Sequence, residues 1–256
     1  MRIGNNYVFK KSMDFVSESD SCASMRGVCG KTILLLLITI ATAIFSLLTV
    51  KVSYISDGGL ILVGYILSPI ITFILSITMS LTPKSARFLS IPYAIFEGLS
   101  IGSLSLILMF ALGGKETGLL LGLALLITIT IFLIGAILYT TGIIKVTSKF
   151  TRILFVALIG LVATTTILSI ISIFSTSVAS LYLGDSNLAL LISIVSIVIA
   201  SLYTVISFDN ANSIVRNRLD KTYEWYASFG IILNIIWLFY EILRVLLIIL
   251  SRSRNN

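Results

Sequence analysis

The chain contains no histidine, only two cysteines and few charged residues. Without histidine it has no histidine-liganded zinc site, no histidine proton relay and no Ser-His-Asp triad. Cys22 and Cys29 do not have the C-x-x-C spacing of metal or redox sites, so we expect two free thiols. No P-loop or dinucleotide-binding fingerprint is found in the sequence, and no other nucleophile–base set stands out. We therefore expect that the protein is not an enzyme.

The chain has few charged residues and a large excess of hydrophobic residues. Charged residues make up 11% of the chain and hydrophobic residues 57%, against about 25% and 45–50% in soluble globular domains. Only residues 1–30 are polar throughout, and we interpret them as a cytoplasmic N-terminal segment. Residues 31–250 form apolar runs, each near the ~20 residues that a membrane-spanning helix needs. We predict an all-α membrane protein with one domain of seven transmembrane helices, at 31–50, 60–81, 88–112, 118–142, 152–174, 188–207 and 227–250.

Lysine and arginine are distributed unevenly among the segments between these runs. If the N-terminus is cytoplasmic, thirteen of the 18 basic residues fall on the cytoplasmic side and four outside, with Arg244 inside a run. Positive residues accumulate on the cytoplasmic side of membrane proteins. We therefore predict a multi-pass protein of the cell membrane with a cytoplasmic N-terminus and an outer C-terminus. We interpret the basic residues as topology anchors and as contacts for anionic lipid. We therefore expect the lipid bilayer as a partner and no nucleic acid.

The first apolar run has an alternative interpretation. Residues 33–40 followed by Ala41-Thr42-Ala43 resemble a signal peptide with its cleavage site. The apolar sequence continues through Val50, and the preceding 30 residues are partly acidic, which favours a retained span.

Glycines lie four positions apart in the third run, in the segment EGLSIGSLS. Gly98 and Gly102 have the small-x-x-x-small spacing that lets membrane helices approach closely. We therefore predict close helix packing at these positions, in preference to phosphate binding.

Several polar side chains lie inside or at the end of apolar runs. Such side chains are costly in hydrocarbon and often mark ion pathways. At a rise of 1.5 Å per residue, Glu97 and Asn234 lie ~13 and ~10 Å from the cytoplasmic ends of their runs, and Asp209 follows the sixth run. We interpret these three residues as candidates for a cation pathway or gate that faces the cytoplasm. Glu241 and Arg244, three residues apart in the last run, can form a local charge pair.

Four segments of the chain occur in an order that resembles the Bax inhibitor-1 (transmembrane BAX inhibitor motif) family, in its bacterial branch. The resemblance covers about residues 30–250 and includes the number of spans and a basic sixth loop. The segments are PYAIFEGLSIGSLS (92–105), YTTGIIKVTSKFTRILFVALIGLV (139–162), SFDNANSIV (207–215) and YASFGIILNIIWLFYEILRVL (226–246).

This resemblance implies a pH-sensitive calcium leak channel or exchanger. It also implies a central last helix and two hydrogen-bonded aspartates, one at the end of helix six and one on helix seven. Two adjacent carboxylates share a proton, because both cannot stay charged. Loss of that proton frees oxygen ligands for Ca²⁺. Asp209 matches the first aspartate and Asn234 stands at the second position, so these two are the candidate calcium ligands. No other cofactor is implied.

The chain departs from the family pattern in ways that weaken this expectation. Asn234 cannot titrate, the run 60–81 contains no acid, and Phe150 follows Lys149 where an acid is usual. The acid pair is therefore degenerate. An alternative function, implied by the resemblance to some bacterial members, is a non-transporting membrane protein that modulates a membrane-anchored protease or another membrane partner. No oligomeric state is predicted.

Overall fold

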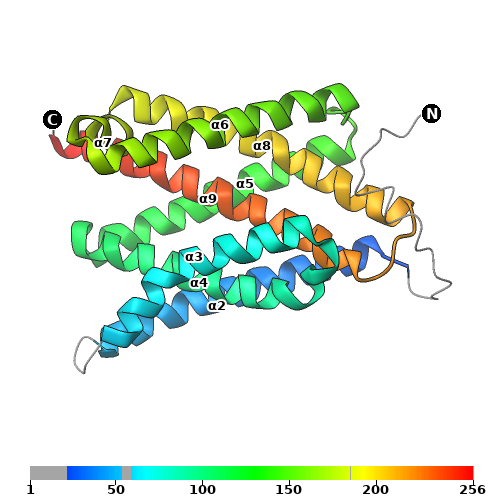
Figure 1. Cartoon of the computed structure of the whole chain (residues 1–256), viewed down its shortest axis with the longest axis horizontal. Helices are drawn as coiled ribbons and strands as arrows, with labels where there is room; N and C mark the ends of the chain where they lie inside the picture. Colours follow the sequence, from blue (N-terminus) through cyan, green and yellow to red (C-terminus); the bar gives the residue numbers. More distant parts are fainter. Residues whose placement is uncertain (1–21, 54–58, 185, 256) are drawn as a thin grey trace. The chain divides into compact units, whose positions relative to one another are not determined.

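The structure is a computed structural model that describes residues 22–53, 59–184 and 186–255. Nearly all of these residues are helical and none lies in a strand, which confirms the all-α prediction (Figure 1). Residues 1–21 of the predicted N-terminal segment lie outside the described part. The helices are α2 (Met25–Ser53), α3 (Gly59–Leu81), the 3₁₀ helix η1 (Pro83–Ser85), α4 (Ala86–Leu112), α5 (Gly114–Thr140), α6 (Ser148–Phe174), α7 (Thr176–Leu183), α8 (Asn187–Arg216) and α9 (Tyr223–Asn255).

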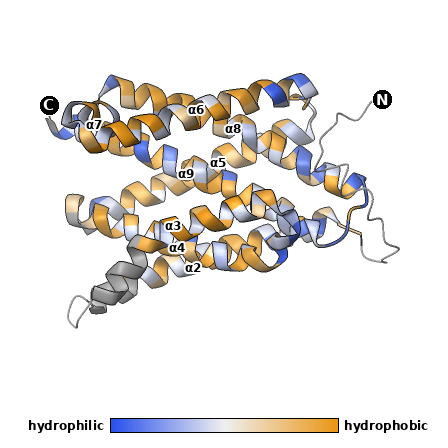
Figure 2. Cartoon of the chain, viewed as in Figure 1, coloured by the Kyte–Doolittle hydropathy of each residue, from blue (hydrophilic) through white to orange (hydrophobic). Residues whose placement is uncertain are grey.

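Six helical stretches in the described residues are long and apolar enough to cross a membrane, and the apolar stretch Leu67–Leu81 of α3 is shorter. Hydrophobic residues extend along most of the length of these helices, and hydrophilic residues gather toward several of their ends (Figure 2). This pattern shows a helical, multi-pass membrane protein, while the count of seven spans stays a prediction. The six stretches are Met25–Leu47, Pro83–Met109, Gly114–Thr140, Ser148–Phe174, Asn187–Arg216 and Tyr223–Arg254.

The helix at the sixth predicted span is longer than the span itself. α8 continues to Arg216, so Asp209 lies about two turns before the end of the helix instead of at its end. The polar sequence after residue 207 still contains a helical pattern, because Ala211 and Ile214 are three residues apart and both are buried. Arg216 in the last turn also complements the negative end of the helix dipole.

The chain divides into two compact units, which are described separately. Unit 1 consists of Met1–Thr117 and Asn210–Leu233, and unit 2 of Gly118–Asp209 and Asn234–Asn256. The last helix, α9, contributes its first eleven residues to unit 1 and the remainder to unit 2. The single transmembrane domain at 31–250 and the central position of the last helix therefore stay predictions.

In unit 1, α2 and α4 pack closely at the two glycines that the sequence singled out. A methyl group at Gly98 would overlap the Thr42 hydroxyl and the Thr39 carbonyl. At Gly102 it would overlap the Ser46 side chain. The absence of side chains at these positions lets α4 lie directly on α2. The prediction of close packing at Gly98 and Gly102 is confirmed.

Candidate functional site

An aromatic cluster joins α5 and α8 in unit 2. The ring centroid of Phe208 lies 5.1 Å from that of Phe132 and 6.2 Å from that of Tyr139. Phe132 and Tyr139 are seven residues apart and therefore share one face of α5. Between them, a methyl group at Gly135 would lie only 3.0 Å from Thr204 Cγ2. The two helices thus approach closely at Gly135, and this contact fixes α5 beside the part of α8 that carries the first candidate residue.

Asp209 is half-buried on α8 and is held by a neutral partner. The Tyr139 hydroxyl donates a hydrogen bond to Asp209 Oδ1 at 3.2 Å. In the described part of the chain, no lysine or arginine forms an ion pair with this carboxylate. A carboxylate in a membrane helix is costly unless a proton or a cation neutralises it. Asp209 therefore stays a candidate position for a proton or a cation.

Asn234 is buried on α9 and binds α8 one and a half turns before Asp209. Its amide lies 2.7 Å from the Thr204 hydroxyl. In the amide orientation that satisfies every polar atom, Asn234 Oδ1 accepts from the Thr204 hydroxyl and from the Thr204 backbone N–H at 3.2 Å. Nδ2 then donates to the Ala200 carbonyl at 3.3 Å. Both ends of the amide are used in joining α8 to α9.

The structure gives Asp209 and Asn234 different hydrogen-bond partners. Thr204, the partner of Asn234, and Asp209 are five residues apart on α8, which corresponds to ~7.5 Å along the helix axis. Among the described residues, no group of three or more His, Cys, Asp or Glu side chains is placed to hold a metal ion. Calcium coordination by Asp209 and Asn234 stays a prediction, and it requires Asn234 to release Thr204.

Glu97 belongs to the other unit. It lies on α4 of unit 1 with 5% of its surface exposed, next to the close contact that Gly98 makes with α2. Because Asp209 and Asn234 lie in unit 2, the convergence of the three residues on one cavity stays a prediction.

Glu241 and Arg244, the predicted charge pair on α9, have different surroundings. Arg244 donates a hydrogen bond to the Tyr182 carbonyl at 2.6 Å, and its guanidinium lies 4.5 Å from the centre of the Tyr182 ring. Tyr182 belongs to α7, a short helix that the sequence analysis did not predict. Within the described residues, Glu241 and Arg244 do not form an ion pair.

The Glu241 carboxylate faces α8 instead. It lies beside Ser193, Ser196 and Trp237. Its Oε2 atom and both serine hydroxyls are buried without a hydrogen-bond partner among the described residues. Buried polar groups of this kind are commonly completed by an ordered water or an ion. Unit 2 therefore holds a second acidic position, separate from Asp209.

Glu224, at the start of α9, was not among the candidate residues predicted from the sequence. This carboxylate is 1% exposed, accepts hydrogen bonds from the Ser24 backbone N–H at 2.7 Å and the Ser24 hydroxyl at 3.1 Å, and forms an ion pair with Lys31. A methyl group at Gly27 would overlap it. Ser24, Lys31 and Glu224, which we call the Glu224 cluster, fix the start of α9 to α2 in unit 1. A sequence signal was present, because an acid in the first turn of a helix is favoured by the helix dipole.

Long apolar helices that carry buried polar side chains define the class of the protein, a multi-pass helical membrane protein. The sequence profile of the family described as Bax inhibitor 1 like matches residues 5–251, almost the whole chain. The chain belongs to this Bax inhibitor-1 family. No curated protein and no solved structure matches it.

Proposed function

We propose that the protein is a cation leak pathway of the cell membrane, with calcium as the candidate ion and Asp209 as the principal carboxylate. Family membership supports the proposal. The observation that carries it is the state of Asp209, a half-buried carboxylate on a membrane helix whose partner is the neutral Tyr139 hydroxyl. An acid with this partner retains its attraction for a cation, whereas an acid paired with lysine or arginine does not.

A single carboxylate is better suited to the passage of an ion than to its tight binding. Calcium takes six to eight oxygen ligands, which carboxylates, hydroxyls, carbonyls and water supply. Asp209 brings one negative charge, and Tyr139 holds and orients one of its oxygens. Conduction requires binding strong enough to attract an ion and weak enough to release it. Asp209 therefore attracts the ion while water completes its coordination.

Weak pH control is part of the same proposal. In an aspartate pair, repulsion between the two carboxylates retains a proton near neutral pH. Asn234 has no titratable proton, and its amide forms hydrogen bonds with Thr204 and Ala200. We propose a pathway in which the second position joins α8 to α9 and does not sense pH.

Purified protein in liposomes tests the leak directly. Calcium entry into vesicles that contain the protein, followed with an encapsulated indicator, is expected to exceed entry into protein-free vesicles. Entry at the protein-free rate, from pH 6 to 8 and in both orientations of the gradient, would contradict the proposal. Because we predict a cytoplasmic N-terminus, vesicles in which the protein has one known orientation would also give the direction of the leak.

The alternative function is a non-transporting protein that modulates a membrane-anchored protease or another membrane partner. The observation that favours it is the amide of Asn234, which is fully engaged in helix packing and leaves one acid where the family has two. A protein-free rate of calcium entry, together with altered proteolysis in cells that lack the chain, would select this function.

A further inference from the structure

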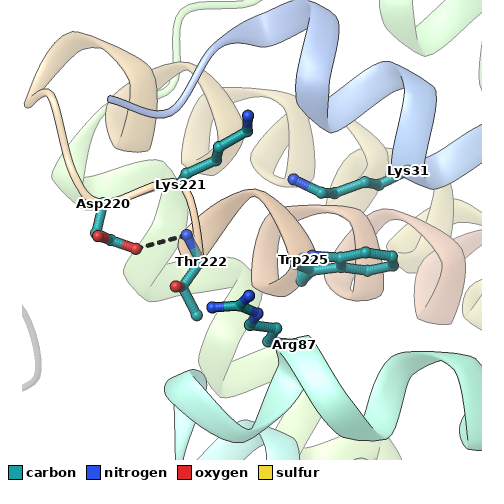
Figure 3. Close-up of a pocket in the computed structure, with 6 residues that line it drawn as sticks. All are labelled: Lys31, Arg87, Asp220, Lys221, Thr222 and Trp225. Atoms are coloured by element: carbon teal, nitrogen blue, oxygen red, sulfur yellow. Dashed lines mark hydrogen bonds between the residues drawn. The ribbon is translucent and has the colours of Figure 1, made fainter. Parts of the chain in front are cut away.

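A cavity of about 390 Å³ lies in unit 1 near the beginnings of α2, α4 and α9 (Figure 3). This volume lies within the ~300–1,000 Å³ of small-molecule sites in proteins. The side chains around it come from α2, α4, the loop before α9 and the first turn of α9. They are Lys31, Arg87, Asp220, Lys221, Thr222 and Trp225.

The lining is positive, and its single acid is already engaged. Asp220 accepts a hydrogen bond from the Thr222 backbone N–H at 2.7 Å. The hydrogen bonds from Thr222, followed by the charges of Arg87 and Lys84, hold the pKa of the Asp220 carboxyl below its ordinary value. Asp220 is therefore ionised at neutral pH and turned toward its own loop.

Two of the three cations in the lining form no direct ion pair within the described residues, although the charge of Arg87 acts on Asp220. Lys31 is paired with Glu224 and lies 5.2 Å from the centre of the Trp225 ring. Arg87 and Lys221, by contrast, form no ion pair within the described part of the chain. Their charges are free to bind an anion in the cavity.

The ends of the helices add to this positive potential. Arg87 is in the first turn of α4, Trp225 in the first turn of α9 and Lys31 in the second turn of α2. The partial positive charge at a helix N-terminus acts within about its first turn. The beginning of α4, which carries no acid, therefore adds to the side-chain cations near the cavity, whereas Glu224 offsets this charge at the beginning of α9.

Apolar surface adjoins the cavity. The Phe88 ring lies 5.8 Å from the Arg87 guanidinium and is 74% exposed. Trp225 is an aromatic residue of the type that gathers at membrane–water interfaces. A ligand bound at Arg87 therefore has exposed apolar surface near it.

We propose that this cavity, the basic pocket, binds the phosphate group of an anionic phospholipid. Basic pockets between membrane helices bind lipid headgroups through this chemistry. The planar guanidinium of Arg87 offers two parallel hydrogen bonds to phosphate oxygens, and Lys221 adds a compact charge. Free phosphate has the same anionic chemistry but no acyl chain for the Phe88 surface, so the lipid is the ligand that uses the whole site.

The chain has two tryptophans, at 225 and 237, so one substitution yields a direct reporter of the pocket. In the full-length Trp237→Phe protein, Trp225 is the only source of tryptophan emission. We expect a saturable change in this emission when phosphatidylglycerol is titrated into protein held in phosphatidylcholine bicelles. Inorganic phosphate at the same concentration is expected to leave the emission unchanged.

Substitutions inside and outside the basic pocket then show where phosphatidylglycerol binds. Arg87→Gln with Lys221→Gln is expected to weaken the apparent affinity for phosphatidylglycerol about tenfold or more, since two charge-assisted contacts are lost. Lys145→Gln with Lys149→Gln makes the same change of net charge at two exposed positions outside the pocket, and is expected to leave the affinity unchanged. Asp220→Asn removes the acid from the lining and is expected to tighten binding, a gain that misfolding cannot produce.

Three results would overturn the proposal. An equal loss in both double variants would show attraction to surface charge in general. An equal response to inorganic phosphate would show a soluble anion as the ligand. Emission that does not saturate with phosphatidylglycerol would show that the pocket does not bind the lipid.

Discussion

Asp209 and Glu224 are two carboxylates of one chain that are held in opposite ways. Glu224 is buried, receives two hydrogen bonds from Ser24 and is neutralised by Lys31. Asp209 is half-buried and receives its hydrogen bond from an uncharged phenol, Tyr139. At the scale of single residues, Glu224 has a charged partner and Asp209 a neutral one, which is why we propose Asp209 as the carboxylate of the cation pathway.

Calcium entry should depend on Asp209 more than on the acids of the outer loops. Asp209→Asn removes the charge while keeping the shape of the side chain, and we expect entry into liposomes to fall by about tenfold or more. Tyr139→Phe removes one hydrogen bond to the carboxylate but keeps its charge, so a smaller change than that of Asp209→Asn is expected. Asp57→Asn and Asp185→Asn are matched controls at positions outside the described residues. Equal effects at all the aspartates would remove Asp209 from the mechanism.

The pH dependence of entry should change when an acid is restored at position 234. In the native chain we expect entry to vary weakly between pH 6 and 8, because Asn234 cannot hold a proton. Asn234→Asp places a carboxylate beside the Thr204 and Ala200 positions, near Asp209 on α8, and repulsion then makes one of the two retain a proton. A steeper pH profile is expected in the same liposome measurement. If the native profile is already steep and Asn234→Asp leaves it unchanged, another group senses the proton, with Glu97 the first to test.

At the scale of helices, the contact between α2 and α4 depends on the lack of side chains at Gly98 and Gly102 of α4. Gly98 meets Thr42 and the Thr39 carbonyl so closely that no side chain fits. Packing of membrane helices relies on such close approach, since lipid supplies no hydrophobic force between them. The stability of unit 1 is therefore sensitive to a single methyl group.

Gly98→Ala is expected to destabilise the protein by about 1–3 kcal/mol, the range for overpacking a well-packed contact. Gly122→Ala, in α5, is the matched control, because a methyl group there meets no atom within 4 Å. It should leave stability unchanged or raise it slightly, since alanine is the better helix former. Thermal unfolding in detergent, followed by circular dichroism, measures both. Similar shifts in the two variants would mean that α2 and α4 are not in close contact.

The joint between α2 and α9 gives a second prediction at this scale. Glu224→Gln leaves Lys31 without its partner, and we expect a loss of about 2 kcal/mol; the buried-pair range of 3–5 is reduced because the lysine is partly exposed. Lys31→Met combined with Glu224→Gln removes both charges, keeps an acceptor for Ser24 and should recover part of that loss. The same unfolding measurement compares them. A double variant less stable than Glu224→Gln would show that the charges do more than neutralise one another.

For the whole molecule, the orientation in the membrane is the first property to establish. The distribution of basic residues predicts a cytoplasmic N-terminus and an outer C-terminus. In a background with Cys22→Ser and Cys29→Ser, which removes the two exposed thiols, Ser253→Cys should react with an impermeant maleimide added outside the cell. Reaction from the cytoplasmic side alone would show an even number of spans.

Hydrophobic runs predicted a helix at each of the seven places, and the spacing of Gly98 and Gly102 predicted the close contact with α2. Both signals are local in sequence. The partners of the site residues were not predictable in this way, because Tyr139 is 70 residues from Asp209, and Ser24 is 200 residues from Glu224. The extension of α8 was missed because the polar residues after 207 conceal the buried positions Ala211 and Ile214.

Because Ser24 and Glu224 are 200 residues apart, their contact can form only late in translation. At ~5–20 residues per second, Ser24 and Lys31 leave the ribosome about 10 to 40 seconds before Glu224 does. Throughout that interval Glu224 is not yet available to pair with Lys31 or to fill the space beside Gly27. Unit 1 therefore completes its fold only when translation is nearly finished. A nascent chain that stops before α9 can pack α2 against α4, but it lacks the contact that fixes the start of α2.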